Sequence, residues 1–143
     1  MRVALEAARR GAAEGEVPVG AAMVIAGDVV AVAHNEPIGR TDATAHAEVL
    51  AIREAGGKTG NYRLAGATLY ATVEPCVMCC GAILSARIER VVFGAADPKA
   101  GGAMSLYRLL EDARLNHVAA VTGGVLAEEC GALLTEFFKG RRR

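Results

Sequence analysis

The sequence has little of what would mark a disordered or fibrous chain. It contains no tryptophan, and aromatic residues make up only 4% of its 143 residues, whereas hydrophobic residues make up 52%. Disordered chains combine low hydrophobicity with high net charge, and neither is present. This length is the usual size of one domain. We therefore expect residues 1–143 to form a single folded domain with a core of Ala, Val, Leu and Ile.

The sequence also lacks an excess of charge of either sign. Sixteen basic residues balance sixteen acidic ones, so the formal net charge is zero. A non-specific nucleic-acid binder usually carries a strongly basic balance, so any contact with nucleic acid must be local. The local candidate is the C-terminal tail with Lys139 and Arg141–Arg143. A solvated, frayed terminus is the alternative interpretation of this run.

Long apolar segments are missing as well. No run approaches the roughly 18 apolar residues of a membrane span, and the charged first ten residues lack the apolar centre of a signal peptide. Three of the four cysteines, Cys76, Cys79 and Cys80, fall within five positions. In a chain that is not secreted, such crowding indicates metal or redox chemistry rather than a disulfide framework. We expect a cytoplasmic protein without a membrane partner.

Apolar runs and turn residues together predict an α/β fold. Helices are expected at residues 1–15, 45–57, 76–87, 105–114 and 126–142, and strands at residues 21–27, 29–35, 67–73, 90–95 and 117–123. The first two strands should form an antiparallel hairpin that turns at Gly27-Asp28, and residues 36–44 should form a loop. Alternating strands and helices from residue 68 onwards indicate parallel pairing in the rest of the sheet.

Two short segments carry residues suited to chemistry, namely residues 46–48 (HAE) and 75–79 (PCVMC). Cysteines at i and i+3 lie on one face of a helical turn, so two thiolates can reach one ion. The preceding Pro75 places both in the first turn, where the helix dipole favours thiolates. His46 adds a third ligand, which leaves the fourth tetrahedral position of Zn²⁺ to a catalytic water. We expect one zinc ion per chain.

Glu48 is expected to move protons rather than to bind the metal. Regular helix spacing would put His46 and Glu48 roughly 200° apart, so both can approach one ion only if His46 precedes the helix. Asp42 and Thr44 are N-cap residue types just upstream, which fits a helix entrance there. A carboxylate beside the attacking water can accept its proton and deliver it to the substrate.

Each element alone also has a plainer interpretation. A C-x-x-C pair occurs in redox enzymes and structural zinc sites, His46 could be a polar residue at a helix start, and Glu48 could be a surface charge. Together, however, H-x-E followed by P-C-x-x-C is a known signature of zinc-dependent nucleobase deaminases. Cys80 should point about a third of a turn away from Cys79 as a spare thiol, and Cys130 should pack in the core.

On these residues the chain resembles the tRNA adenosine deaminases of the cytidine deaminase superfamily. The likeness covers nearly the whole length and includes EVPVGA (16–21), HNEPIGR (34–40), TAHAE (44–48), NYRL (61–64), the segment that ends in EPCVMC (67–79), RVVFGA-x-D (90–97) and the EFF-x-x-RR tail (136–142). Generic members of the superfamily share only the zinc motifs. NYRL, the NEPIG loop and the EFF tail are typical of the tRNA-editing branch.

The resemblance implies a three-layer α/β/α fold, with a central five-stranded mixed sheet and helices on both faces. It implies a homodimer whose active sites lie near the subunit interface. It also implies that His46, Cys76 and Cys79 bind zinc and that Glu48 shuttles protons. The reaction would convert adenosine to inosine at the wobble position of a tRNA anticodon and release ammonia.

The resemblance further indicates which residues meet the substrate. The Asn35 side chain, the Ala47 backbone and Pro75 would hold the flipped base. Positions that match the neighbourhood of the anticodon stem-loop are Asp97, Lys99, Phe137, Phe138 and Arg141–Arg143. Packing of the last helix onto the sheet is the alternative role for one of the two phenylalanines. Pro98 departs from the family pattern and should stiffen its loop.

Three other functions compete with this interpretation. A deaminase of free guanine, cytosine or a nucleoside would share the zinc site, but the basic and aromatic tail favours RNA because a free base needs no phosphate partner. A non-catalytic RNA-binding subunit with a structural zinc would not need Glu48. A thiol–disulfide oxidoreductase would leave His46 without a role.

Overall fold

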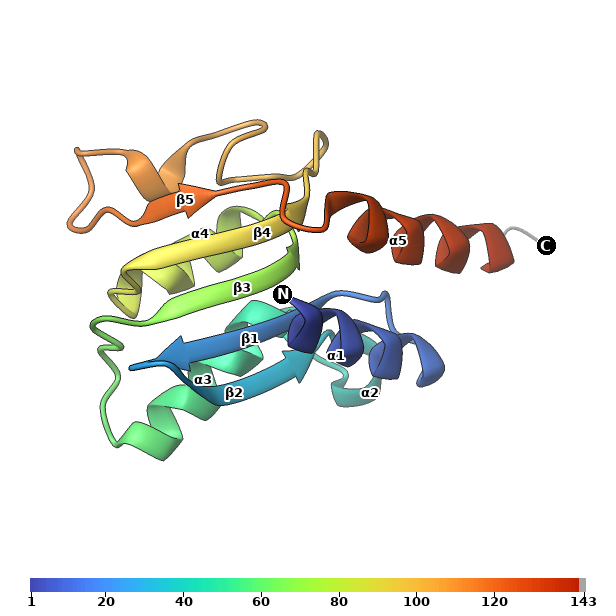
Figure 1. Cartoon of the computed structure of the whole chain (residues 1–143), viewed down its shortest axis with the longest axis horizontal. Coiled ribbons are helices and arrows are strands. Elements are labelled where there is room, and N and C mark those ends of the chain that lie inside the picture. The colour runs from blue at the N-terminus through green and yellow to red at the C-terminus, as the bar shows by residue number, and fades with distance from the viewer. Residues whose placement is uncertain (142–143) are drawn as a thin grey trace.

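The computed structural model describes residues 1–141, which form a five-stranded sheet between two layers of helices (Figure 1). In chain order the elements are α1 (Arg2–Ala13), β1 (Gly20–Ile25), β2 (Asp28–His34), α2 (Pro37–Arg40), α3 (Ala47–Thr59), β3 (Thr68–Val73), α4 (Val77–Ser85), β4 (Arg90–Ala95), a 3₁₀ turn (Leu109–Glu111), β5 (Ala120–Thr122) and α5 (Ala127–Arg141). Within residues 1–141, we find no helix with the length and apolar character needed to cross a bilayer.

The sheet is mixed, with the strand order β2-β1-β3-β4-β5. Strand β1 is antiparallel to both β2 and β3, whereas β3, β4 and β5 run parallel. Helices α1 and α5 lie on one face and α3 and α4 on the other (Figure 1). The predicted hairpin edge, parallel half and three-layer arrangement are all confirmed.

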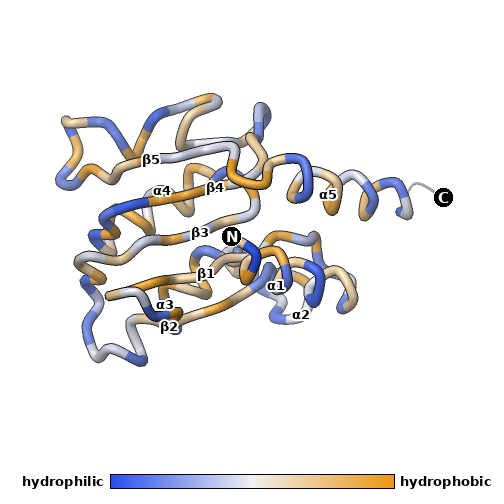
Figure 2. Tube along the Cα trace, in the orientation of Figure 1, coloured by the Kyte–Doolittle hydropathy of each residue, from blue (hydrophilic) through white to orange (hydrophobic). Residues whose placement is uncertain are grey.

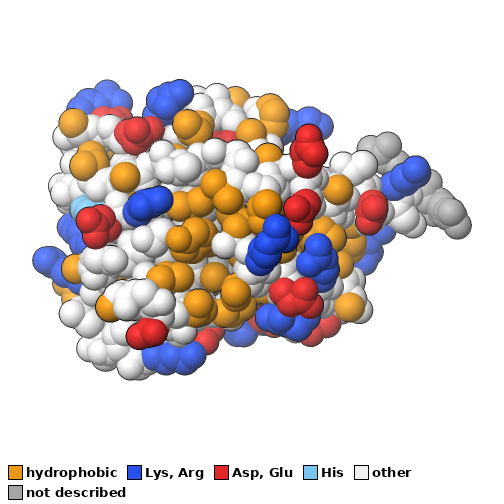
Figure 3. All heavy atoms as spheres, in the orientation of Figure 1, with side chains coloured by type: hydrophobic (Ala, Val, Ile, Leu, Met, Phe, Trp, Pro, Cys, Tyr) orange, Lys and Arg blue, Asp and Glu red, His pale blue; other side chains and the backbone are white. Residues whose placement is uncertain are grey.

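The core is built largely from small and branched aliphatic side chains. Its buried members include many alanines, and Phe93 is among the few large ones. Because helices cover the central strands on both faces, these strands are nearly continuous apolar runs, as Figure 2 shows for β1. Apolar side chains also gather on the face between α1 and α5, with charged side chains around them (Figure 3).

The hairpin turn lies one residue earlier than predicted. Strand β1 ends at Ile25 and pairs with Asp28, so the two turn residues are Ala26 and Gly27. Their φ angles are 51° and 83°. A two-residue turn of this kind needs positive φ at both positions, which explains a glycine at the second.

Three other expected boundaries were wrong. Residues 36–44 contain the short helix α2, and α3 runs through Gly56-Gly57 to Thr59 because Gly60, with φ 69°, is the left-handed C-cap. Residues 105–114 form only a 3₁₀ turn at Leu109–Glu111 instead of a helix. Their backbone N–H groups bond elsewhere: Leu106 to Gly101, Leu109 to Gly102, and Ser105 to the Glu74 side chain. Tertiary hydrogen bonds thus override local helix propensity here.

Candidate active site

The entrances of α3 and α4 bring the two chemical segments together on one face of the sheet. His46 is the N-cap of α3 and Cys76 the N-cap of α4, and both have extended backbone, with ψ angles of 150° and 176°. His46 therefore precedes the helix, as predicted. Asp42 does not cap α3, because it accepts a hydrogen bond from Thr44 N (2.9 Å) in a turn upstream. The turn sets the approach of the chain to His46.

Three metal-ligating side chains meet at these entrances. His46 Nδ1 lies 3.6 Å from Cys76 Sγ and 3.5 Å from Cys79 Sγ. The three ligand atoms lie within 4.8 Å of one another, so one ion can contact all of them. Two sulfurs and one imidazole nitrogen suit Zn²⁺. Cys80 lies outside this group, with its thiol 3.7 Å from the Pro75 carbonyl oxygen.

The thiols differ in their readiness to ionise. Hydrogen bonds from the Cys79 thiol and from His46 lower the pKa of Cys76 to about 4. The hydrogen bond to Cys76, together with burial, raises the pKa of Cys79. Burial raises the pKa of Cys80 to about 12. Two thiols that share a proton form a site in which a divalent cation can take the place of that proton.

Glu48 is a buried carboxyl group with an unsatisfied oxygen. Its residue is 3% exposed, and among the described residues Oε1 has no hydrogen-bond partner. Burial raises its pKa. An unpaired buried polar group costs about 1–3 kcal/mol, and such groups concentrate at functional sites. The donor set and this oxygen fit a catalytic zinc ion with a water beside it.

A cavity of about 160 Å³ opens at this point, and its lining includes Asn35, His46, Glu48, Cys76 and Asp97. The Asn35 Oδ1 accepts a hydrogen bond from the Ala47 backbone N–H (2.8 Å), which leaves the Asn35 amide N–H groups for a ligand. Ala47 and Pro75 are fully buried and lie outside the lining. The structure thus brings Asn35 and Asp97 to the metal-ligating side chains and leaves Ala47 and Pro75 outside the cavity lining.

The residues predicted to meet RNA fall in separate places. Lys99 and Phe138 line a second surface hollow together with Lys139. The Arg141 guanidinium instead donates to the Gly15 carbonyl oxygen (2.8 Å) and lies 4.4 Å from the Phe137 ring centroid. Phe138 is 46% exposed, so Phe137 is the more buried of the pair. Arg142 and Arg143 lie outside the described residues.

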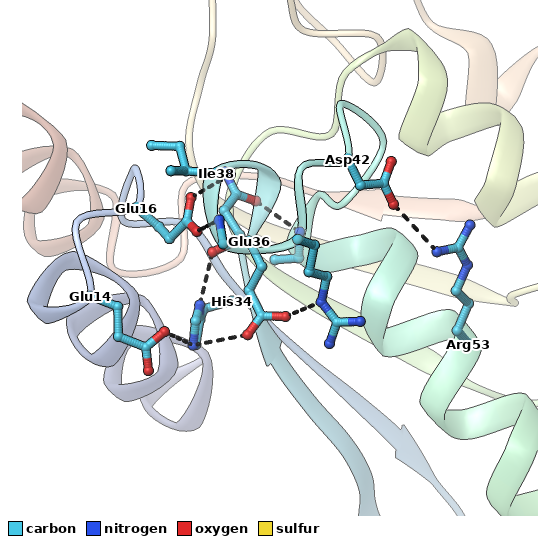
Figure 4. A network of polar contacts seen from close by, with 11 residues as sticks. Glu14, Glu16, His34, Glu36, Ile38, Asp42 and Arg53 are labelled. Carbon is cyan, nitrogen blue, oxygen red and sulfur yellow. Dashed lines mark hydrogen bonds and ion pairs between the residues drawn. The ribbon is translucent and has the colours of Figure 1, made fainter.

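The segment that carries Asn35 is anchored by groups that the sequence interpretation missed. Glu16 accepts hydrogen bonds from the backbone N–H groups of Ile38 (3.1 Å) and Gly39 (2.8 Å). His34 Nδ1 donates to the Asn35 carbonyl oxygen (2.9 Å), and its Nε2 faces Glu14 at 3.4 Å (Figure 4). The available signal was the conspicuous acidic residue at the start of the EVPVGA segment.

Glu74 was also missed, although it stands in the EPCVMC motif. It is 3% exposed, and it accepts hydrogen bonds from the backbone N–H groups of Asp97, Ala103, Met104 and Ser105. Burial raises its pKa, but these hydrogen bonds and one from the Ser105 hydroxyl outweigh burial, so the pKa is lowered. A charged residue at the end of a buried strand was the signal.

Comparison with known proteins agrees with this geometry. Residues 1–95 match the cytidine and deoxycytidylate deaminase zinc-binding region. The chain is 49% identical over 143 residues to a tRNA-specific adenosine deaminase of Bacillus subtilis, covering 100% of this chain and 89% of that protein. A structure from studies of A-to-I editing by tRNA:A34 deaminases superposes with a TM-score of 0.91 at 42% identity, covering 94% of this chain and 97% of the other.

A more distant solved structure, the guanine deaminase of Nitrosomonas europaea, has a TM-score of 0.82 at 25% identity. The match covers 94% of this chain and 80% of the guanine deaminase chain. The fold is therefore shared with deaminases of free bases. A guanine deaminase of Bacillus subtilis is 40% identical, but the match covers only 66% of this chain. The tRNA-specific proteins are 49% identical over 99–100% of it. The chain belongs to the cytidine and deoxycytidylate deaminase zinc-binding family, and within it to the tRNA-specific adenosine deaminases.

Proposed function

We propose that this chain deaminates the wobble adenosine of a tRNA anticodon to inosine and releases ammonia. The observation that carries the proposal is the unpaired Glu48 oxygen, which lies at the cavity shared with His46 and Cys76. The full-length relatives named tRNA-specific adenosine deaminase support the RNA substrate. An anticodon loop exposes the base that a duplex would hide, so flipping it into the cavity costs little.

The imidazole of His46 and the thiolates of Cys76 and Cys79 would hold one zinc ion per chain. The mutual distances of these atoms support this assignment. When bound, the ion lowers the pKa of a coordinated water toward about 7 and so supplies a nucleophile at neutral pH. The attack takes place at the ring carbon that bears the amine.

Glu48 handles the protons of this reaction. It accepts a proton from the attacking water and delivers it to the ring nitrogen beside the reacting carbon. Glu48 then passes the proton of the newly attached hydroxyl group to the amine, and the C–N bond breaks, so water and adenosine give inosine and ammonia. A buried carboxyl group with a raised pKa suits this task, because it must both take up and release a proton.

Asn35 would orient the base at the mouth of the cavity. Its Oδ1 is held by the Ala47 N–H, so its amide group can donate to a ring nitrogen. Ala47 and Pro75 would act on the base through the backbone that they fix. The Ala47 backbone N–H fixes the orientation of the Asn35 side-chain amide. The Pro75 carbonyl oxygen accepts a hydrogen bond from Gly102 N (2.8 Å), in the loop that carries Asp97.

Asp97, Lys99, Phe138 and Arg141 would meet the anticodon stem-loop. The shared hollow of Lys99 and Phe138 supports stacking of a base next to a cationic group. Binding should weaken with rising salt with a modest slope, because few phosphates are neutralised. Deleting residues 141–143 should raise the KM for the stem-loop and leave zinc content unchanged. An unchanged KM would mean that these residues do not contact the RNA.

We also propose that residues 1–143 form one domain and that two chains form a homodimer near the active site. Helices α1 and α5 pack on the same sheet, and Arg2 pairs with Glu129 on α5 (3.6 Å). Large apolar side chains are more than a third exposed at the start of α4, at Val77 and Met78, and in the segment after Gly101, at Met104, Leu106 and Tyr107. Sedimentation should therefore give twice the chain mass, and a fully active monomer would refute the dimer. A tRNA substrate supports a cytoplasmic location.

The decisive experiment offers several substrates to the purified zinc enzyme. They are an anticodon stem-loop with adenosine at its first anticodon position, the same loop with guanosine there, free adenosine and free guanine. Chromatography of the nucleosides should find inosine from the adenosine stem-loop, at a far higher rate than from free adenosine. Faster conversion of free guanine to xanthine would overturn the proposal in favour of the base deaminases that share this fold.

A further inference from the structure

The Glu74 carboxylate gathers hydrogen bonds from one loop only. Its Oε1 lies 3.0 Å from Asp97 N and accepts from the Ser105 hydroxyl. Its Oε2 accepts from three consecutive backbone N–H groups, those of Ala103 (3.2 Å), Met104 (2.8 Å) and Ser105 (2.8 Å). The ion pairs found among residues 1–141 do not include Glu74, so its charge is balanced by backbone dipoles.

The same loop, residues 97–105, packs closely against the Glu74 carboxylate. A Cβ at Gly101 would lie 2.2 Å from Glu74 Oε2, so only glycine fits there. The Gly101 backbone forms a bridge with Cys76, and Gly102 N donates to the Pro75 carbonyl oxygen (2.8 Å). Residues 97–105 are thus seated on the segment that carries two of the three metal-ligating groups.

This loop faces the substrate side of the site. Asp97 and Ala100 line the cavity with His46 and Glu48, and Lys99 lines the hollow with Phe138. Movement of the loop would therefore shift the groups that meet the RNA, while the metal ligands on α3 and α4 stay in place. Glu74 bonds to both ends of the loop, at Asp97 and at residues 103–105, and so connects them to the ligand segment.

We infer that Glu74 is a positioning residue, whose carboxylate holds residues 97–105 in register with Cys76 so that Asp97 and Lys99 meet the RNA. It touches neither the metal nor the base. The inference rests on the proposed function for its RNA substrate. A residue that only stabilised the fold would affect unfolding, but it would not alter RNA affinity in the folded enzyme.

The first test measures the loop without any substrate. Glu74→Gln keeps the size of the side chain but turns one oxygen into an amide that faces N–H donors. In the zinc enzyme, amide hydrogen exchange at Asp97 and at residues 103–105 should become at least about tenfold faster than in the wild type. Exchange in α3 and α4 and the zinc content should not change. Unaltered protection of the loop would overturn the inference.

The second test separates binding from chemistry. In Glu74→Gln the KM for the anticodon stem-loop should rise about tenfold, while kcat changes less than about threefold. Gly101→Ala pushes the loop from the opposite side and should shift the same constants in the same direction, which keeps the test valid if Glu74→Gln fails to fold. Gly81→Ala on α4 is the matched control, since a Cβ there meets nothing within 4 Å.

The outcomes separate the two proposals. If both loop variants left KM unchanged, Glu74 would not be a positioning residue, even with an active wild type. If the wild type failed to deaminate the stem-loop while Glu74→Gln still released the loop amides, the proposed function would fail and the anchoring of the loop would stand.

Discussion

Two buried glutamates flank the metal-ligating side chains, and their surroundings are opposite. Glu48 follows His46 by two residues and has an oxygen without a hydrogen-bond partner among the described residues. Glu74 precedes Cys76 by two residues, and its oxygens accept hydrogen bonds from four backbone N–H groups and one hydroxyl. Both residues are 3% exposed.

This difference teaches that burial alone does not reveal the role of a carboxylate. Burial raises the pKa of Glu48, whereas at Glu74 the hydrogen bonds outweigh burial and lower it. The unpaired oxygen of Glu48 suits the proposed proton transfer, and the hydrogen bonds of Glu74 suit the proposed anchoring of the loop. The unpaired oxygen of Glu48 costs stability, and the five hydrogen bonds of Glu74 contribute to it.

The largest effect should come from removing a metal ligand, because Glu48 would then have no zinc-bound water from which to accept a proton. Cys79→Ala should reduce bound zinc from one ion per chain to nearly none and abolish deamination, because two ligands cannot hold the ion tightly. Cys80→Ala is the matched control and should keep both. Metal analysis by plasma mass spectrometry decides the point, and loss of zinc from Cys80→Ala would refute the ligand assignment.

Glu48→Gln should have the next largest effect. Glutamine keeps the size of the side chain but cannot transfer a proton near pH 7, so kcat should fall by about 100- to 10,000-fold. Zinc content and KM should be retained. Unlike a change at Glu74, this substitution should leave the free energy of unfolding of the metal-free protein equal or higher, since burial disfavours the charged form of the Glu48 carboxyl group. Near-normal inosine formation at full zinc occupancy would contradict the proton-transfer role.

The sequence predicted those parts of the molecule whose signals are local. The cysteine spacing and the position of His46 before a helix needed only a few neighbouring residues, and so did the hairpin. The loop anchor did not, because Glu74 and Ser105 are 31 positions apart. The same distance effect hid the contact of Arg141 with Gly15, which are 126 positions apart. Residues 105–114 looked helical because nothing local shows that Glu74 captures Ser105 N.

Glu16→Gln tests whether a buried carboxylate contributes more to the free energy of unfolding when it accepts hydrogen bonds from more backbone N–H groups. Glu16 is also 3% exposed but holds two N–H groups, those of Ile38 and Gly39, rather than four. Its replacement should lower the free energy of unfolding by about 1–2 kcal/mol in urea titrations, less than Glu74→Gln. Glu89→Gln is the control, since Glu89 is exposed and forms no ion pair within residues 1–141. Equal losses at Glu16 and Glu74 would break the comparison.

The smallest effect should come from Ser105→Ala, which removes one donor from Glu74 and leaves the carboxylate and the four N–H groups in place. The hydroxyl donates to a charged acceptor, but Ser105 itself is exposed, so water can replace part of the lost bond. We expect a loss of about 1 kcal/mol in the free energy of unfolding and a KM increase of less than about threefold. Thr59→Ala is the matched control, because its hydroxyl donates to the neutral Ala55 carbonyl (2.9 Å) at the C-terminal end of α3, and Thr59 lines neither the cavity nor the hollow. Its stability loss should be smaller and its KM unchanged. If the two substitutions cost the same and neither altered KM, the hydroxyl would contribute nothing particular to the anchoring of the loop, and the role of Glu74 would rest on its backbone partners alone.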